Sequence, residues 1–137
     1  MNLITESQML ILATLLFLLG LLTGVAMPLF RNKRMGLSAH LVGVQHGIVL
    51  WIVGLIMARL EPSPWLDTLM TWSLVLGLYG LWLSMLLAAI WGASRALPMA
   101  GEGHQSTPGR EGVVTGLVYG PALLIIVGIV ILLWRLL

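Results

Sequence analysis

Two histidines, His40 and His46, lie six residues apart in an apolar stretch, and Gln45 precedes the second of them. An imidazole surrounded by hydrocarbon costs free energy unless it forms a hydrogen bond, so such histidines usually line a functional cavity or a proton path. The structural alternative is a histidine whose ring bonds only to a neighbouring helix. Two such rings beside a glutamine favour a functional site.

The spacing of the two histidines limits what they can bind together. Six residues of an α-helix turn through about 600°, so the rings point about 120° apart and lie about 9 Å apart along the axis. They cannot both ligate one iron from the same helix. Each ring faces its own cavity, or serves a different interface in a ring of identical subunits. Gly43 and Gly47 flank the pair and let a bulky group approach the backbone.

Tyr79 is the second kind of residue that could do chemistry. It lies near the middle of the third apolar stretch and is the only tyrosine at that depth. A phenol hydroxyl in an apolar setting needs a hydrogen-bonding partner, which makes Tyr79 a candidate proton donor. The alternative is a hydroxyl that simply bonds to a backbone carbonyl.

Arg34 belongs to a basic cluster, with Arg31 and Lys33, that lies one to two turns before His40. Such a cluster commonly fixes the orientation of a membrane protein. It could also meet acidic groups of a cofactor bound near His40.

The composition places these residues in a membrane. Hydrophobic residues make up 59% of the 137 residues and charged residues 9%, and the mean hydropathy is +1.03, whereas a soluble domain would carry about 25% charged residues. The chain has no cysteine, which excludes disulfides, zinc–thiolate sites, iron–sulfur clusters and thiol nucleophiles. Its few basic residues are scattered between apolar runs, so nucleic acid is not an expected partner.

The hydrophobic runs predict a single domain, 1–137, with four transmembrane helices, over about residues 9–30, 39–60, 68–94 and 113–134. Ser38 is expected to cap the second helix after a turn at 36–38, and Asp67 or Thr68 to cap the third. The predicted fold class is therefore all-α, an integral membrane four-helix bundle.

The connections predict an orientation in a bacterial-type inner (cytoplasmic) membrane. Loops 31–38 and 95–112 share one side and carry five of the seven basic residues. The positive-inside rule places these loops in the cytoplasm and both termini outside. All five acidic residues fall outside the predicted spans, so no buried carboxylate is expected for a proton-coupled transporter.

The segment from Arg34 to Gly47, which reads RMGLSAHLVGVQHG, resembles the hydroxylaminobenzene mutase family. The chain is also similar, more distantly, to styrene oxide isomerase. That relative is a four-helix membrane enzyme that forms trimers, binds haem b between subunits and uses ferric iron as a Lewis acid. Its axial histidine on the second helix corresponds to His40.

Other motifs support the resemblance and also mark departures from it. Gly77-Leu78-Tyr79 matches a Gly-x-Tyr motif on the third helix of the isomerase, and Tyr119-Gly120-Pro121 matches an aromatic-Gly-Pro motif on the fourth. An Asn-Gly pair of the isomerase is His46-Gly47 here, and a carboxylate two turns before the tyrosine is Thr71. These departures predict a different substrate on the same scaffold.

The resemblance implies an isomerase that converts an arylhydroxylamine, such as hydroxylaminobenzene, to an ortho-aminophenol in nitroaromatic degradation. Ferric haem b would be held by His40 as metal ligand, with Arg34, Gly43 and Gly47 around the cofactor. His46 and Tyr79, from the neighbouring subunit of a homotrimer, would move protons. An apolar aromatic substrate would reach the site from the lipid bilayer.

Two other classes of function stay open at this point. A haem-binding or haem-free membrane anchor could pass electrons or assemble a larger complex. A transport or channel subunit would need a polar path through the membrane, and only the second span offers one.

Overall fold

The computed structural model describes residues 4–137, and every regular element within that range is a helix. The elements are α1 (Glu6–Ala26), a short 3₁₀ helix (Met27–Leu29), α2 (Lys33–Met57), α3 (Pro64–Trp91), α4 (Pro98–Gly101) and α5 (Pro108–Leu136). Four of them, α1, α2, α3 and α5, are long and apolar enough to cross a membrane. The predicted fold class, an all-α integral membrane bundle, is confirmed.

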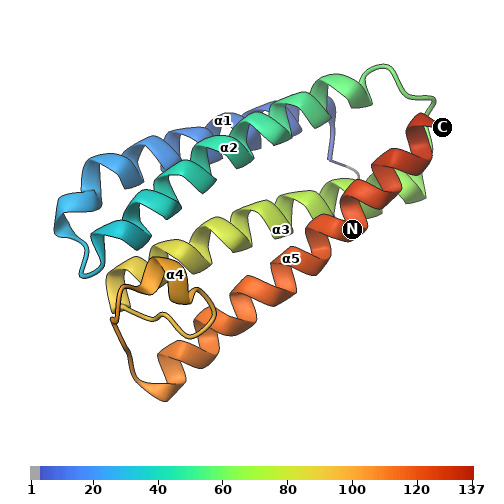
Figure 1. Cartoon of the computed structure of the whole chain (residues 1–137). Helices are drawn as coiled ribbons and strands as arrows, with labels where there is room; N and C mark the ends of the chain where they lie inside the picture. Colours follow the sequence, from blue (N-terminus) through green and yellow to red (C-terminus); the bar gives the residue numbers. More distant parts are fainter. Residues whose placement is uncertain (1–3) are drawn as a thin grey trace.

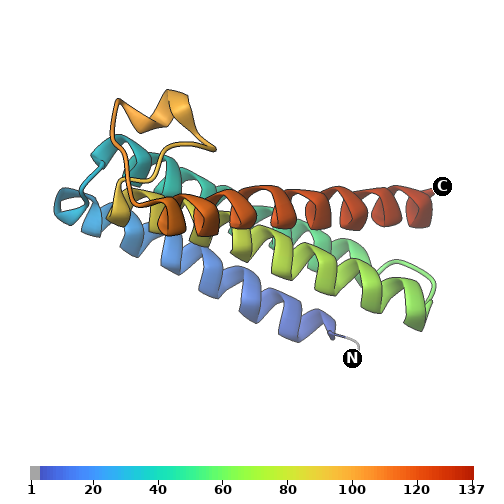
Figure 2. The same ribbon diagram turned by 90° about the horizontal axis from the view of Figure 1, so that it is seen from below.

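The long helices form two antiparallel hairpins, α1 with α2 and α3 with α5, and α2 packs against α3 to join them (Figures 1 and 2). The connection between α1 and α2 lies at the same end as α4 and its flanking loops. The connection between α2 and α3 lies at the other end, together with the C-terminus. The short link at residues 58–63 makes α2 and α3 antiparallel neighbours, as its length predicts.

Glycines bring α1 and α2 into backbone contact. A methyl group added to Gly20 would lie 2.5 Å from the Val44 nitrogen, and one added to Gly43 would lie 2.6 Å from the Gly20 Cα. Gly47 meets the backbone of Phe17 in the same way. Small residues allow membrane helices to approach closely. Close packing matters there because the hydrophobic effect does not drive helices together within lipid.

In the hairpin of α3 and α5, glycines of α3 make room for a proline of α5. Pro121 lies inside α5, buried and facing α3, where Gly77 and Gly80 leave room for it. Gly128 of α5 packs on Leu74 of α3 further along. The proline therefore lies where its ring fills a recess, which is how a helix-breaking residue is tolerated within a membrane bundle.

α2 begins at Lys33, six residues before the predicted start. Asn32 occupies the N-cap position, and its side-chain oxygen accepts a hydrogen bond from the Met35 N–H at 3.0 Å. The expected turn at 36–38 is therefore helical, and Ser38 does not cap the helix. Its hydroxyl donates instead to the Arg34 carbonyl at 3.3 Å.

α3 and α5 also begin earlier than predicted, at Pro64 and Pro108. Proline suits the first helical turn because the N–H it lacks would have no partner there. Asp67 lies within α3, where its carboxylate accepts the Ser63 N–H at 2.8 Å, and Thr68 donates to the Pro64 carbonyl. The expectation that Asp67 or Thr68 starts the helix is therefore wrong.

The expectation that no carboxylate is buried is also wrong. Glu111 is 5% exposed and Asp67 is 9% exposed, each in the first turn of a long helix. Asp67 pairs with Arg135 of α5 at 3.2 Å, and Arg135 also donates to the Glu61 carbonyl. Both carboxylates lie in the first turn of their helices, where they bind backbone N–H groups of the preceding loops. They therefore stabilise the connections between helices.

Candidate functional site

His40 lies against α1, and its ring orientation is set by a backbone group there. Its Nδ1 lies 2.8 Å from the Gly20 carbonyl oxygen. Because a carbonyl can only accept, Nδ1 carries a proton, and in the neutral imidazole Nε2 then keeps its lone pair. Histidines that ligate metals generally donate their other ring N–H in this way. The ring is half-buried, and its role as a metal ligand stays a prediction.

His46 faces a different helix. Its Nδ1–H donates to the Leu78 carbonyl oxygen of α3 at 2.9 Å. The two imidazoles therefore bond to α1 and to α3 respectively, as the 120° difference in direction predicts. His46 also leaves Nε2 free to accept or donate a proton.

Tyr79 lies on α3, and its hydroxyl donates to the Leu12 carbonyl oxygen of α1 at 2.6 Å. This is the backbone-bonded arrangement, and the phenol oxygen still has lone pairs with which to accept a hydrogen bond. Tyr79 also lines an apolar groove of about 370 Å³ between α1 and α3. The groove is lined by Leu12, Val75, Leu76, Tyr79, Gly80, Trp82 and Leu83.

Trp82 of α3 lines the groove and contacts both α1 and α2. Its indole N–H donates to the Thr23 hydroxyl of α1 at 3.3 Å, and its ring lies beside Gly43 of α2. A buried indole with a satisfied N–H forms a rigid wall. Trp51, by contrast, stacks on Phe17 with ring centroids 4.9 Å apart.

Gly43 and Gly47 are buried in the contact between α1 and α2. Because they have no side chain, Gly43 contacts the Gly20 backbone and the Trp82 ring, and Gly47 contacts Phe17. The two glycines serve helix packing, and their position beside a cofactor stays a prediction.

Two further positions singled out by the motifs lie outside the groove. Thr71 is fully buried, and its hydroxyl donates to the Asp67 carbonyl at 2.8 Å. Tyr119 of α5 is 61% exposed.

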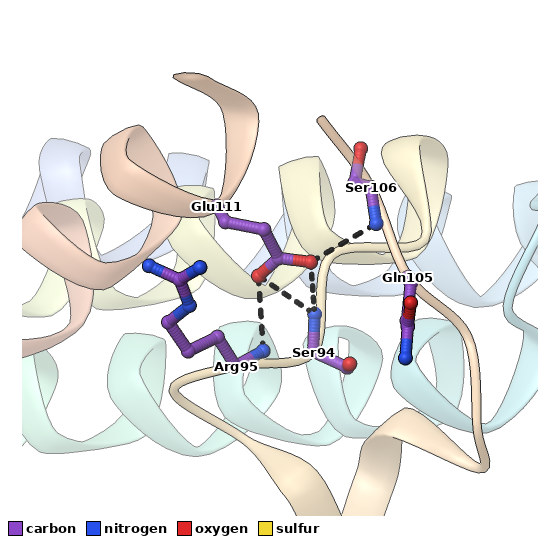
Figure 3. A pocket seen from close by; sticks show the side chains of 5 residues that line it. All are labelled: Ser94, Arg95, Gln105, Ser106 and Glu111. Carbon is purple, nitrogen blue, oxygen red and sulfur yellow. Dashed lines mark hydrogen bonds between the residues drawn. The ribbon is translucent and has the colours of Figure 1, made fainter. Parts of the chain in front are cut away.

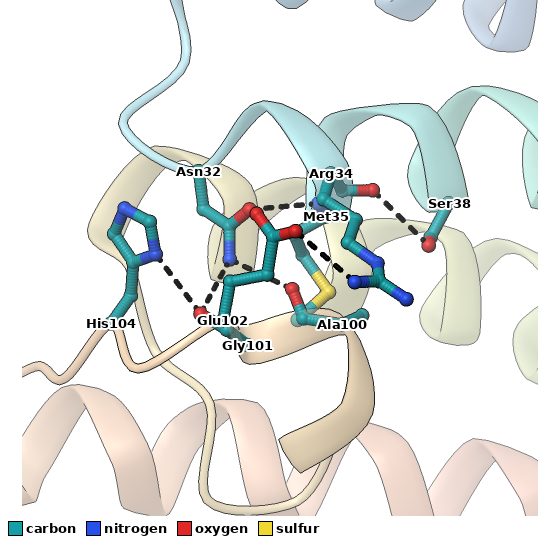
Figure 4. Close-up of polar contacts among 8 residues, drawn as sticks. All are labelled: Asn32, Arg34, Met35, Ser38, Ala100, Gly101, Glu102 and His104. Atoms are coloured by element: carbon teal, nitrogen blue, oxygen red, sulfur yellow. Dashed lines mark hydrogen bonds and ion pairs between the residues drawn. The ribbon is translucent and has the colours of Figure 1, made fainter.

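Arg34 forms an ion pair with Glu102 at 3.1 Å, with both side chains about half exposed. The pair belongs to a larger contact between the start of α2 and α4 (Figure 4). There the buried Asn32 amide donates to the Ala100 and Gly101 carbonyls. The role of Arg34 toward acidic groups of a cofactor stays a prediction.

Glu111 holds both ends of the loop between α3 and α5. Its carboxylate accepts hydrogen bonds from the backbone N–H groups of Ser94, Arg95 and Ser106 (Figure 3). Gln105 completes the lining of a polar cavity of about 280 Å³ beside it. Both carboxylate oxygens already have donors, so Glu111 has a structural role.

Sequence reasoning missed the contribution of α1. Gly20 and Gly24 both meet α2, and the ring of His40 lies against Gly24. Their spacing, two glycines four residues apart in a membrane helix, is a signal that could have found them.

The donor set bears on which kind of metal site is possible. Within residues 4–137, no three His, Asp or Glu side chains come together in a group that could hold a metal ion. One free imidazole nitrogen fits an iron that brings its other ligands, as haem does. The chemistry of the donor set is therefore compatible with haem, and His40 as its ligand stays a prediction.

Comparison with known proteins places the chain among membrane isomerases. The sequence model of the styrene oxide isomerase family matches residues 5–137. Hydroxylaminobenzene mutase HabA of Ectopseudomonas oleovorans is 46% identical over 106 residues, which cover 76% of this chain and 78% of that protein. Hydroxylaminobenzene mutase HabB of the same organism is 38% identical over 130 residues, covering 94% and 79%. No solved structure matches the chain.

Both relatives bear the name that the motif around His40 predicts, so the predicted resemblance is confirmed. The match to the family model covers all four long helices. The chain is therefore an isomerase and belongs to the styrene oxide isomerase family.

Proposed function

We propose that this isomerase rearranges an arylhydroxylamine, hydroxylaminobenzene in the simplest case, to the ortho-aminophenol by intramolecular hydroxyl transfer. The names of the two relatives support this substrate. The structural observation that carries the proposal is the apolar groove between α1 and α3, which Tyr79 lines.

The groove suits a small aromatic substrate. Its volume of about 370 Å³ lies at the lower end of the range for small-molecule sites. Leucine, valine and tryptophan side chains would surround the aromatic ring, and an apolar substrate that partitions into lipid would enter between the helices. Exclusion of water matters because water that captured an electron-poor ring would give a different product.

The reaction balances without an outside reagent. The N–O bond breaks, a C–O bond forms at the ortho carbon, and one ring proton leaves that carbon while one is gained at nitrogen. Because its own O–H donates to the Leu12 carbonyl, the Tyr79 oxygen would accept a hydrogen bond from the departing hydroxyl group. His46 would move the ring and nitrogen protons through Nε2. In a trimer these two residues would come from the neighbouring subunit.

The cofactor in this proposal is ferric haem b. When bound, it would supply a Lewis acid that polarises the N–O bond without changing its oxidation state. His40 would hold the haem iron through Nε2, since its Nδ1–H is bonded to the Gly20 carbonyl, and Arg34, now paired with Glu102, would meet an acidic group of the cofactor.

Exposed helix faces support the homotrimer. Methyl groups added to Gly109, Gly112, Gly116 or Gly120 would meet nothing within 4 Å, so α5 presents a smooth face away from α3. Gln45 lies exposed on α2 among leucine and isoleucine side chains. Small residues and lone amides of this kind are the usual contacts between membrane helices.

The rival function, an electron-carrying haem anchor, usually needs two axial ligands on one haem. Within one subunit, His40 and His46 bond to different helices. They therefore cannot hold the same iron from one subunit, so an electron-carrying haem would need its second ligand from a neighbouring subunit. A low-spin spectrum with two histidine ligands would support the anchor instead.

Isotope labelling and absorption spectra test the proposal together. Detergent-purified protein should convert phenylhydroxylamine labelled with ¹⁸O in its hydroxyl group to ortho-aminophenol that retains the label. It should show a Soret band that substrate perturbs and that His40→Ala abolishes, whereas His46→Ala should keep the band and lose activity. Label lost to water would contradict intramolecular transfer, and full activity without iron would contradict the role of haem.

A further inference from the structure

We infer that Gly24 is a positioning residue for His40. Together with the Gly20 carbonyl it forms a recess on α1 that holds the imidazole with Nδ1–H turned inward and Nε2 turned outward. The part of this inference that concerns iron rests on the proposed function, whereas the part that concerns the ring does not.

The three atoms nearest to a methyl group added at Gly24 all belong to the His40 ring. A methyl group added there would lie 2.6 Å from the His40 Nδ1, 3.0 Å from its Cε1 and 3.1 Å from its Cγ, and these are its three nearest neighbours. Contacts under 3.0 Å force a shift, and here the atom that must move is the nitrogen that donates to Gly20. A side chain at position 24 would therefore break this hydrogen bond first.

The helices themselves cannot easily give way. Gly20 and Gly43 touch through their backbones four residues before Gly24 and three residues after His40. Close-packed backbones leave little room for a rigid shift of α1 against α2. A methyl group at position 24 should therefore be accommodated by rotation of the His40 side chain.

Rotation of the ring would remove the hydrogen bond that sets the tautomer. Which ring nitrogen of a histidine keeps its lone pair depends on the hydrogen bond that the other nitrogen makes. Without the Gly20 carbonyl as partner, Nδ1 is no longer held in its protonated form, and Nε2 no longer points out of the recess. Gly24 thus acts on the reactive nitrogen through His40 and need not touch substrate.

The first test reads the tautomer directly. Protein with ¹⁵N-labelled histidine, in detergent micelles, should show the His40 signal almost wholly as the Nδ1–H form, with His40→Gln used for assignment. Gly24→Ala should reduce that form to less than half. A wild-type His40 protonated mainly at Nε2 would overturn the inference without any variant, and so would Gly24→Ala with an unchanged tautomer.

Matched variants separate positioning from general damage. Gly36→Ala lies one turn before His40, and its methyl group would press on Phe30 at 2.5 Å. Val25→Ala changes the neighbour of Gly24 in the chain, at a position that is 79% exposed. Both should leave the His40 tautomer unchanged, and a tautomer shift in Gly36→Ala as large as in Gly24→Ala would overturn the inference.

The second test uses hemin as the probe. Hemin titrated into wild type should give a Soret band, and Gly24→Ala should raise the apparent Kd at least tenfold. A wild type that binds no hemin would refute the haem part of the proposed function while leaving the tautomer result to decide on Gly24. Equal hemin affinity in the two proteins would overturn the link between the recess and iron binding.

Discussion

At the scale of residues, the three candidate side chains share one arrangement. His40, His46 and Tyr79 each donate to a backbone carbonyl of a neighbouring helix, those of Gly20, Leu78 and Leu12 respectively. Each donor is thereby satisfied within the apolar interior, and each side chain keeps an atom that can still act on a ligand. The backbone-bonded arrangement and the catalytic role are thus compatible.

Tyr79→Phe tests the catalytic role at this scale. The variant loses one hydrogen bond, so its free energy of unfolding should fall by only about 1 kcal/mol. If the hydroxyl acts on the departing oxygen, kcat should fall by about 10²-fold or more. Both are measured on detergent-purified protein, by thermal unfolding and by turnover of phenylhydroxylamine.

Tyr119→Phe is the matched control, because Tyr119 is the only other tyrosine and is 61% exposed on α5. Its turnover should stay within about twofold of wild type. A tenfold loss would mean that the variant had raised the activation free energy by about 1.4 kcal/mol. A Tyr79→Phe variant as active as this control would refute a role for the hydroxyl.

At the scale of elements, α1 acts through its backbone. It offers the Gly20 and Leu12 carbonyls to His40 and Tyr79, and its glycines let α2 approach. The positions of the two candidate groups therefore depend on how closely α1 and α2 pack.

Gly43→Ala should weaken that packing. The added methyl group would lie 2.6 Å from the Gly20 Cα and 2.8 Å from the Trp82 ring. Overpacking of this kind costs about 1 to 3 kcal/mol, measurable by unfolding in mixed micelles. Val25→Ala is the control, and it should be neutral or slightly stabilising because alanine favours helix and position 25 is 79% exposed. Equal stability of the two variants would contradict backbone contact at Gly43.

The α3–α5 hairpin is closed by an ion pair whose loss should be costly. The side chains of Asp67 and Arg135, taken without their backbone, are both 13% exposed, and the Arg135 Nε lies 3.2 Å from the Asp67 Oδ1. Arg135→Gln leaves a largely buried carboxylate unpaired, so we expect a loss of about 1 to 3 kcal/mol, below the cost for a fully buried pair.

Arg34→Gln removes the pair with Glu102, whose side chains are 57% and 48% exposed. Exposed pairs contribute less than about 1 kcal/mol, so this variant is the control in the same unfolding assay. A larger loss for Arg34→Gln than for Arg135→Gln would reverse the expected order.

At the scale of the whole molecule, the open face of α5 predicts how copies of the chain meet. Gly116→Leu would place a large side chain on the face formed by Gly112, Gly116 and Gly120, and should reduce the proposed trimer to smaller species in size-exclusion chromatography with light scattering. Val25→Leu, on a site of α1 that is 79% exposed, should leave the oligomer unchanged. A trimer retained by Gly116→Leu would exclude this face from the interface.

The orientation in the membrane can be tested because the chain has no cysteine. Lys33→Cys lies at the end that carries five of the seven basic residues, and Glu61→Cys lies at the other end. The positive-inside rule predicts that a membrane-impermeant maleimide labels only Glu61→Cys in intact cells, and both variants after lysis. Labelling of Lys33→Cys in intact cells would reverse the proposed orientation.

Hydropathy by itself determined the fold class, because an unbroken apolar run long enough to cross a bilayer can only be satisfied as a helix. The helical period likewise determined that His40 and His46 point to different sides. The helix starts were misjudged at Lys33 and Pro64, because whether a polar residue or a proline begins a helix depends on local hydrogen bonds that hydropathy does not contain.

Only the tertiary structure decided which partner each side chain meets. The Nδ1–H of His40 donates to the Gly20 carbonyl because glycines allow α1 and α2 to pack closely, and the Tyr79 hydroxyl donates to the Leu12 carbonyl of α1. Glu111 is buried because loop N–H groups converge on it. These contacts join residues distant in sequence, so composition and periodicity reveal which groups need partners, while the packing of the helices selects them.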